Sequence, residues 1–482
     1  MVAVARRVFF WYNRNVKSSR LTTSAAHLKG RRVLLVGLGL HGGGEATVRW
    51  LASIGATIRV TDMKTVADLA PTLRRLRSIS FQRVLGKHDE AGVRWAQAVI
   101  QNPGVPETAP EIRFAKKLGR PIYNEASLFV TDFPGTLIGV TGTRGKTTTT
   151  LLLGAIIKRW HRDTIISGNV REVAMLDLLP KSSAATLAVL ELSSYQLERL
   201  PVPNRAMHVA VMTNLKVDHL NRHGTMKKYA DIKYNLFRGQ SATDVAVLHA
   251  NDPYCRRAAT VTPAKKVWYG RMLPASQSGY TVIHGWVVER RGRTLTRLCR
   301  RSDFGPAGEH NTDNLLAAVA AARALDIPLA IIRQTVQSFA GVPYRQEIVR
   351  TWRGHRFIND TAATSPDGAL AALHVFRRGV FIVGGTDKDL DMKPFAITLA
   401  KRRRSFVTLP GTATEKLLNA LPRPARSLVH QTTSMQEAVT VAMDIARSGE
   451  DIVLSPGAAS FGLFKHEFDR GDAFTRCVKN LR

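Results

Sequence analysis

Acidic residues, cysteines and long apolar runs are all scarce in this sequence. Its 482 residues include only 37 Asp and Glu against 70 Lys and Arg, which gives a formal net charge of +33. The three cysteines, Cys255, Cys299 and Cys477, are widely separated. That spacing argues against a disulfide framework or a thiolate zinc cluster and favours a reducing compartment, the cytoplasm. No run of about 18 apolar residues occurs, which excludes an integral membrane protein with helical spans.

The basic excess makes nucleic-acid binding the first hypothesis, because a surface of this sign attracts polyanions. However, the basic residues are spread along the chain, and dense clusters such as residues 401–404 are short. The sequence has no zinc-finger spacing and no aromatic-basic ribonucleoprotein motif. The charge therefore favours a basic surface or an anionic small substrate, and no dedicated nucleic-acid site is expected.

The length indicates about three domains, and a hydrophobic content of 44% is typical of globular proteins. Residues 1–28 carry five basic side chains and no acid, and we expect them to form a disordered extension outside the fold. Strands alternate with helices in residues 29–130, 131–343 and 344–482, which predicts α/β domains with parallel sheets covered on both faces. We expect strands within residues 32–39, 57–62, 98–104, 121–124, 136–143, 185–194, 206–215, 244–252, 356–360, 379–385, 405–411 and 451–457, and a small antiparallel excursion at 267–300.

The strongest local motif is GVTGTRGKTT at residues 139–148, between an apolar strand and a helical run. Glycines in such a turn let backbone N–H groups surround phosphate oxygens, and the following helix points its positive end at them. Lys146 would reach the β- and γ-phosphates of a nucleotide, and the Thr147 hydroxyl would bind Mg²⁺. Gly139 does not lie at the distance from Gly145 that the first glycine has in the full Walker pattern. The short form GTxGKT therefore matches the sequence better than the motif of a kinase or GTPase does. A glycine-rich turn without a ligand is the alternative.

Another glycine cluster, Gly37 to Gly42, lies earlier in the chain and is called the first glycine cluster below. It is followed twenty residues later by Asp62. This spacing matches a dinucleotide fingerprint, although GxGxxG alone is a weak signal and close packing of a helix on a strand also explains it. The cluster favours a nucleotide or sugar-nucleotide site, whose cofactor need not be NAD.

Glu191 and His219 each lie just past the carboxyl end of an apolar strand, the edge at which open α/β sheets bind ligands. Either residue alone would be interpreted as a helix cap or a surface residue. Because both share a block with the phosphate-binding motif, they are candidate metal ligands.

Six segments occur in the order seen in the Mur ligase family: GTRGKTTTT, LELSSYQLE, TNLKVDHLNRHG, YADIKYNLF, GEHNTDNLLAA and LSPGAASFGLFKHEFDRGDAF. The chain resembles this family from Gly30 to its C-terminus, and most of all the branch that adds D-glutamate. The resemblance implies a Rossmann-like UDP-sugar domain, a central P-loop ATPase domain and a Rossmann-like C-terminal domain for the amino acid. It also implies a monomeric, ATP- and Mg²⁺-dependent ligase that joins D-glutamate to UDP-N-acetylmuramoyl-L-alanine through an acyl phosphate, in peptidoglycan precursor synthesis.

The resemblance also implies a role for each matching residue. Lys146, His219 and Lys233 match catalytic positions, and Lys233 matches a lysine that is carbamylated in these ligases, although by itself it would be interpreted as a solvated charge. The metal positions are Thr147, Glu191, His219 and Lys233. The ATP positions are Gly142, Thr143, Arg144, Gly145, Lys146, Thr147, Thr148, Asn311, Asn314, Arg345 and Asp360. The UDP-substrate positions are Gly39, Leu40, His41, Asp62, Lys64 and Asn169, and those of the amino acid are Thr364, Lys388, Ser460 and Phe461.

Two departures from the family concern the amino-acid pocket. Ala362 lies in a segment where the family often has a lysine, and Glu467 lies in a stretch where an aromatic side chain can line the pocket. These departures leave the amino-acid specificity open and the phosphate chemistry intact.

Three other functions compete with this interpretation. Another Mur ligase or a folylpolyglutamate synthase would share the ATP chemistry, but the first glycine cluster argues against the folate enzyme. A nucleotide-dependent dehydrogenase would leave the 139–148 motif, Glu191 and His219 unexplained. A nucleic-acid-binding ATPase would explain neither the third domain nor the GEHN segment, and steeply salt-dependent binding to DNA would support it.

Overall fold

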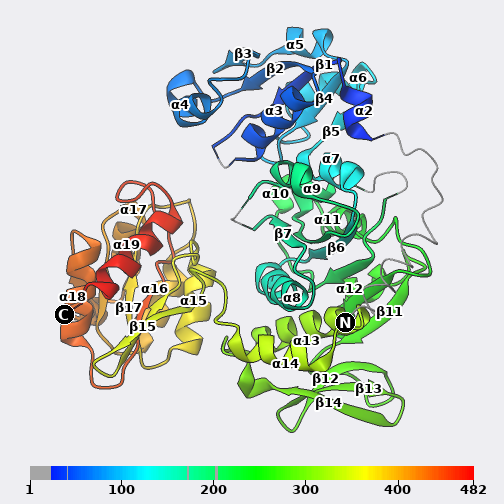
Figure 1. The fold of residues 1–482 in the computed structure, drawn as a ribbon. Helices are drawn as coiled ribbons and strands as arrows, with labels where there is room; N and C mark the ends of the chain where they lie inside the picture. The colour runs from blue at the N-terminus through cyan, green and yellow to red at the C-terminus, as the bar shows by residue number, and fades with distance from the viewer. Residues whose placement is uncertain (1–22, 41, 171–172, 201–204, 482) are drawn as a thin grey trace. The chain divides into compact units, whose positions relative to one another are not determined.

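The computed structural model describes residues 23–40, 42–170, 173–200 and 205–481, so the prediction for His41 lies outside the described residues (Figure 1). The described chain divides into two compact units. The first runs to Phe304 and includes Glu309–Gln337, and the second comprises Gly305–Gly308 and the chain from Ser338. None of the described helices is long and apolar enough to cross a membrane.

The first unit begins with a five-stranded parallel sheet of order β3-β2-β1-β4-β5. Its strands are β1 (Arg32–Val36), β2 (Thr57–Asp62), β3 (Gln82–Leu85), β4 (Ala98–Gln101) and β5 (Ile122–Tyr123). The helices of this region are α2 (Ser24–Leu28), α3 (Gly43–Ser53), α4 (Val66–Arg75), α5 (Glu90–Trp95), α6 (Pro110–Lys117) and α7 (Glu125–Asp132). The predicted strands are confirmed, and β3 is an additional strand at the sheet edge.

Helix α2 corrects the expectation that all of residues 1–28 lie outside the fold. Asp132 accepts hydrogen bonds from the backbone N–H groups of Ser24, at 2.6 Å, and Ala25, at 2.9 Å. Leu28 is fully buried in the hydrophobic core of the unit. The fold therefore includes residues 24–28, whose role a basic composition alone does not reveal.

The same unit contains a nine-stranded sheet of order β14-β13-β12-β11-β10-β9-β6-β8-β7. Its strands are β6 (Thr136–Thr141), β7 (Thr164–Gly168), β8 (Leu187–Glu191), β9 (Val209–Met212), β10 (Val245–His249), β11 (Lys265–Tyr269), β12 (Gly279–Ile283), β13 (Trp286–Arg291) and β14 (Thr294–Arg300). The antiparallel excursion is smaller than expected, because β11 pairs in parallel with β10 and only β12 to β14 are antiparallel.

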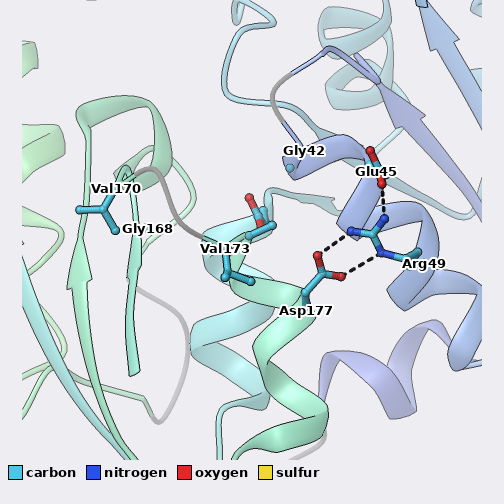
Figure 2. A pocket seen from close by; sticks show the side chains of 10 residues that line it. Gly42, Glu45, Arg49, Gly168, Val170, Val173 and Asp177 are labelled. Carbon is cyan, nitrogen blue, oxygen red and sulfur yellow. Dashed lines mark hydrogen bonds and ion pairs between the residues drawn. The ribbon is translucent and has the colours of Figure 1, made fainter. Parts of the chain in front are cut away.

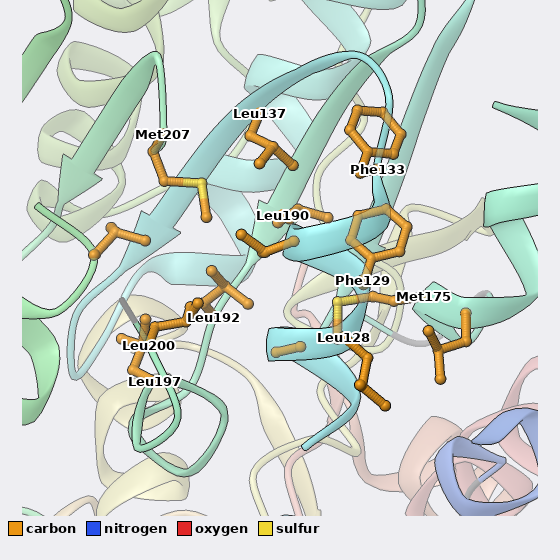
Figure 3. Packing of buried hydrophobic residues seen from close by; sticks show 14 of the residues in the cluster. Leu128, Phe129, Phe133, Leu137, Met175, Leu190, Leu192, Leu197, Leu200 and Met207 are labelled. Carbon is orange, nitrogen blue, oxygen red and sulfur yellow. The ribbon is translucent and has the colours of Figure 1, made fainter. Parts of the chain in front are cut away.

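The helices of this second region are α8 (Lys146–Trp160), α9 (Ser194–Leu197), α10 (Leu220–His223), α11 (Met226–Tyr234), α12 (Pro253–Ala258), α13 (Glu309–Ala324) and α14 (Leu329–Ser338), with the 3-10 helices η1 (Met175–Lys181) and η2 (Arg301–Asp303). Helix α7 leads into this region, and the boundary predicted at residue 130 falls inside it. Its Phe129 and Phe133 stack at 5.0 Å between ring centroids. They pack with Leu137 and Leu190 in one hydrophobic core (Figure 3). The same core contains Val33 and Leu35 of β1, so both sheets share buried apolar packing.

The second unit is built on a six-stranded sheet of order β15-β16-β20-β17-β18-β19. Its strands are β15 (Glu347–Trp352), β16 (His355–Asn359), β17 (Val380–Val383), β18 (Phe406–Thr408), β19 (Val429–Gln431) and β20 (Ile452–Leu454), and all but β15 pair in parallel. Its helices are α15 (Pro366–Val375), α16 (Lys393–Lys401), α17 (Thr412–Ala420), η3 (Arg423–Leu428), α18 (Met435–Ile445) and α19 (Glu467–Lys479). Separate apolar clusters contain buried residues such as Phe395 and Phe474, as expected for a sheet covered on both faces.

Gly44 offers a test of how the first glycine cluster packs. A Cβ at this position would lie 2.0 Å from the carbonyl oxygen of Leu38, in the turn after β1. We expect Gly44→Ala to lower the free energy of unfolding by roughly 1–3 kcal/mol, because helix α3 must move away from the turn. Urea unfolding measures the change, and Gly104→Ala, where the nearest atom lies 3.7 Å away, is the control. Equal stabilities of the two variants would contradict the close approach.

Candidate active site

The turn between β6 and α8 has the shape of a phosphate-binding loop. Gly145 caps α8 in the left-handed conformation, with φ of 82°, and makes no side-chain cap hydrogen bond. The positive end of a helix that starts in such a turn is suited to an anionic ligand. Gly142 has φ of 145°, and a Cβ there would lie 1.9 Å from Thr213 Oγ1. Both glycines are thus required by backbone geometry and by close contact.

Side chains behind the loop bind its backbone. Thr213 Oγ1 donates to the Arg144 carbonyl at 2.6 Å, and Asn214 Nδ2 donates to the same oxygen at 3.0 Å. Asn214 Oδ1 also accepts from the Arg144 N–H at 3.0 Å. Thr213 and Asn214 were not predicted as site residues. The signal that could have found them is a polar Thr-Asn pair directly after β9, the strand that neighbours β6.

The predicted nucleotide residues of this unit gather around the same loop. Lys146 Nζ donates to the Thr143 carbonyl at 3.0 Å, so the lysine folds over its own loop. A Cβ on Gly145 would lie 2.1 Å from Asn314 Oδ1, and Asn314 Nδ2 donates to Asn311 Oδ1 at 3.0 Å. Asn314 therefore reaches the loop from α13, and Asn311 of the same helix holds the Asn314 side chain. Thr147 and Thr148 occupy the first turn of α8.

Glu191 ends β8, directly beside the strand that leads into the loop. Its side chain is 1% exposed, and Oε1 accepts a hydrogen bond from Asn169 Nδ2 at 3.1 Å. Oε2 is buried without a hydrogen-bond partner. A buried carboxylate oxygen without a hydrogen-bond donor is unfavourable unless a bound ligand or metal ion interacts with it. The unpartnered Oε2 therefore fits a metal-binding role.

His219 caps α10 in the left-handed conformation, with φ of 51°. Its Nδ1 is hydrogen-bonded to the Tyr195 hydroxyl at 2.9 Å. Burial lowers the pKa of His219, and the positive charges of Lys233 and Lys146 lower it further, against the opposing effect of Asp218. The histidine is therefore neutral near pH 7, which is the form that binds metal ions.

Lys233 is buried, with 1% exposure, and the view of it as a solvated charge is wrong. Its Nζ donates to the Gly142 carbonyl at 2.9 Å and lies 5.0 Å from the centre of the Tyr229 ring. Burial, followed by the charge of Lys146, lowers the pKa of Lys233 well below its usual value. A neutral amine is therefore favoured at this position.

The described residues contain no group of three or more His, Cys, Asp and Glu side chains that could hold a metal ion. Glu191 and His219 alone therefore do not make a complete site from standard carboxylate and imidazole ligands. A third oxygen ligand would have to come from Thr147, from a nucleotide phosphate or from a modified Lys233.

Asp62 does not have the role expected of the acidic residue in a dinucleotide site. Asp62 Oδ2 accepts the N–H groups of Leu38 at 2.8 Å and Gly39 at 2.9 Å, and Oδ1 accepts that of Lys64 at 2.9 Å. The carboxylate thus binds the glycine turn itself. This use differs from the ribose contact of NAD-binding folds.

A cavity of about 290 Å³ lies beside the first glycine cluster (Figure 2). Arg49 crosses its wall and bonds to Asp177 through Nε at 3.0 Å and Nη2 at 2.6 Å, and also to Glu45. The cavity connects the start of α3 with the segment around Asn169, the two regions predicted for the UDP-substrate. Its lining residues are Gly42, Gly43, Glu45, Arg49, Glu125, Gly168, Val170, Val173, Ala174 and Asp177. Leu40, which lies within the first glycine cluster, has a side chain that is 42% exposed.

The second unit places Asp360 in a buried position. Asp360 Oδ2 accepts from Ser455 Oγ at 2.7 Å, and Oδ1 accepts from the Gln346 N–H at 3.2 Å. Burial raises the pKa of Asp360 to about 7, although these hydrogen bonds and the charge of Arg345 oppose the shift. Asp360 and Arg345, both predicted for the nucleotide, are therefore close enough to interact.

Two of the four residues predicted for the amino acid line one small hollow of the same unit. Thr364 and Lys388 line it together with Ala458 and Ala459. Ser460 follows Ala459 in the chain and is buried, whereas the Phe461 side chain is 58% exposed. Ser460 therefore lies next to the lining in sequence, and the phenylalanine side chain is at the surface.

The three sheets and the P-loop define an α/β nucleotide-binding protein, and three family models match it: a MurD-like N-terminal domain of Mur ligases at 31–124, a Mur ligase middle domain at 140–322 and a glutamate ligase domain of Mur ligases at 344–459. A UDP-N-acetylmuramoylalanine–D-glutamate ligase of Roseiflexus sp. is 40% identical over 94% of this chain and 99% of its own length. The enzyme of the same name from Clostridioides difficile is 34% identical over 94% and 100%. The chain belongs to the Mur ligase family.

Solved structures agree with the fold. A UDP-N-acetylmuramate–alanine ligase from Thermotoga maritima has a TM-score of 0.58 at 20% identity, covering 93% of this chain and 99% of that one. MurF from Acinetobacter baumannii has a TM-score of 0.57 at 16% identity, covering 93% of both chains. At these identities the likeness concerns the fold alone.

Asn214 offers a test of the contacts behind the phosphate loop. We expect Asn214→Ala to weaken ATP binding roughly tenfold, because the variant loses two hydrogen bonds that fix the Arg144 backbone. Isothermal titration with ATP and Mg²⁺ measures the affinity, and thermal melting reports whether the fold persists. Asn419→Ala, at an exposed position of α17, is the matched control. A folded Asn214 variant with unchanged ATP affinity would show that the loop does not need this support.

Proposed function

We propose that this protein is an ATP-dependent ligase that adds D-glutamate to UDP-N-acetylmuramoyl-L-alanine in peptidoglycan precursor synthesis. The observation that carries the ligase chemistry is the group of Lys146, Glu191 and Lys233 around one phosphate-binding turn. The full-length similarity to enzymes named for D-glutamate addition supports the choice of substrates.

The reaction has two steps in this proposal. The alanine carboxylate of the acceptor attacks the γ-phosphorus of ATP, so that an acyl phosphate forms and ADP leaves. The amine of D-glutamate then attacks the acyl carbon, an amide bond forms, and phosphate and a proton leave. Lys146 and the N-terminus of α8 would balance charge on the phosphoryl oxygens in the first step.

Mg²⁺ bound at this site would neutralise phosphate charge and orient the oxygens that react. The unpartnered Oε2 of Glu191, the neutral imidazole of His219 and the Thr147 hydroxyl are the groups proposed to hold it. Lys233 is proposed to be carbamylated, because carbon dioxide reacts with an unprotonated amine and burial favours that form. The carbamate would replace a buried neutral amine by an anion suited to a second metal ion.

The UDP-muramoyl substrate is proposed to bind along the first glycine cluster, with its muramoyl part near Asn169. One observation supports this placement: the cavity that lies between these segments. Thr364, Lys388 and Ser460 are proposed to receive the amino acid, and Asn311, Asn314, Arg345 and Asp360 the nucleotide. Action as a monomer in the cytoplasm remains a prediction.

Phosphate release is the direct test of the proposed function. With ATP and Mg²⁺, we expect release that requires both UDP-N-acetylmuramoyl-L-alanine and D-glutamate, and a product that carries one added glutamate by mass spectrometry. Lys146→Ala should lower turnover roughly 100- to 1,000-fold, because it removes charge from the developing transition state. Lys158→Ala, in the last turn of the same helix, is the control.

Two results would refute this function. One is turnover with another amino acid but not with D-glutamate. The other is tight NAD binding without binding of the UDP-muramoyl compound, which would support a dehydrogenase function for the first domain.

Lys233 gives a separate test of the proposed carbamate. We expect Lys233→Ala to be nearly inactive and to recover part of its activity with added formate or acetate, because a short carboxylate replaces the missing anionic ligand. Depletion of bicarbonate should slow the wild type. Lys228→Ala, an exposed position on the same helix, controls for loss of a positive charge. Full activity of Lys233→Ala at limiting Mg²⁺ would rule out the carbamate.

A further inference from the structure

Arg470 is the largest of the described side chains that are almost completely buried, with 1% exposure. It lies in the first turn of α19, within the FKHEFDRGDAF segment, and the proposed chemistry gives it no role. A buried guanidinium requires an explanation, because arginine is rarely buried without a partner of opposite charge.

All of the hydrogen bonds made by Arg470 end on neutral groups. Nε donates to Thr361 Oγ1 at 2.9 Å and Nη2 to the Thr361 carbonyl at 3.0 Å. Nη1 donates to the carbonyls of Ala458 at 3.1 Å and Ala459 at 3.2 Å. No carboxylate of the described residues forms an ion pair with it within 4.0 Å.

The positive charge of Arg470 persists in this environment. Burial lowers the pKa of Arg470 to about 10, and Glu467 on the same helix partly opposes the shift. The side chain therefore stays protonated at neutral pH. Its hydrogen-bonding neighbours are neutral carbonyl and hydroxyl oxygens, and Glu467 compensates its charge only in part, so this buried cation stabilises an anion that binds nearby.

The groups that Arg470 holds belong to the predicted amino-acid site. Ala458 and Ala459 line the hollow with Thr364 and Lys388, and Thr361 lies in the loop that leads to Thr364. A Cβ on Gly385, in another loop of the unit, would lie 3.4 Å from Arg470 Nη1. One side chain thus holds two loops at the hollow through hydrogen bonds and lies close to a third.

The other charges near the hollow are partly neutralised. Asp387 lines it, but Lys416 Nζ donates to Asp387 Oδ2 at 2.9 Å. Lys388 is exposed to solvent, where its charge is screened. Among the described residues beside these loops, Arg470 is a buried cation with no carboxylate within ion-pair distance.

We propose that Arg470 is a positioning and selectivity residue for the amino-acid substrate. Its hydrogen bonds fix the loops around the hollow, and its unpaired charge favours an amino acid with a carboxylate side chain over the neutral amide. The inference rests on the proposed function and deepens it, since it assigns the preference for an acidic amino acid to a residue that does not touch the substrate.

The test compares D-glutamate with D-glutamine, which has the same shape but a neutral side chain. Binding to the full enzyme with ATP analogue and acceptor present gives an affinity ratio for the two compounds. We expect Arg470→Gln to lower this ratio about tenfold and Arg470→Lys, which keeps the charge, to stay within about twofold of the wild type. Arg476→Gln, an exposed arginine of the same helix, should leave the ratio unchanged.

A purely structural role predicts a different result. Arg470→Gln would then weaken both ligands equally, and an unchanged ratio in a folded variant would overturn the proposal. If Arg470→Gln does not fold, Thr361→Val removes one acceptor and keeps the charge. It should weaken D-glutamate binding several-fold with the ratio preserved, and unchanged binding would also overturn the proposal. A wild type that uses neither compound refutes the proposed function instead.

Discussion

A phosphate-binding turn can offer its N–H groups to a ligand only if the protein satisfies the opposite side of the same backbone. In this protein Thr213 and Asn214 bind the carbonyl of Arg144, and Lys233 binds that of Gly142. Each of these side chains comes from a strand end or helix adjacent to β6. The order of the central sheet therefore decides which residues can support the loop, and the position of Lys146 depends on that support.

Buried polar groups with incomplete partners recur at the places where substrates are proposed to bind. Glu191 keeps one carboxylate oxygen without a donor, Lys233 is a buried amine, and Arg470 is a buried cation beside neutral oxygens. Such groups lower stability unless something compensates them. Their persistence is consistent with a protein in which metal ions, a carbamate and an acidic substrate supply the missing charges, so that the bound state is electrostatically more complete than the free protein.

The sequence predicted the interior strands but missed four of the six edge strands. Strands such as β6, β8 and β9 are buried on both faces and appear as continuous apolar runs. The four strands not predicted, β3, β7, β15 and β19, each lie at the edge of a sheet. Edge strands pair on one side and are partly exposed, so their sequences mix polar and apolar residues and give no clear pattern.

The predictions for the site differed in the same way: motifs that are local in sequence were predictable, and features that depend on tertiary packing were not. The turn at 139–148 was predictable because glycines, lysine and threonine are close in sequence. The burial of Lys233 was not, since its helix carries exposed lysines such as Lys228 and only the packing against β6 distinguishes them. Arg470 was missed for a similar reason, because its acceptors Thr361 and Ala458 are distant in the chain or lie in a loop.

The two glycine clusters show how one composition can serve two kinds of turn. At Gly145 the N-cap of the helix makes no side-chain hydrogen bond, and a buried lysine lies behind the loop. At Gly37 to Gly42 the N–H groups of Leu38 and Gly39 already bind Asp62. An anion that approached the same N–H groups would have to displace this carboxylate, which is held through three backbone hydrogen bonds. The turn at Gly145 is therefore suited to phosphate. The turn at Gly37 to Gly42 is instead held in place by Asp62, and a ligand can lie against it in the cavity beside Gly42 and Gly43.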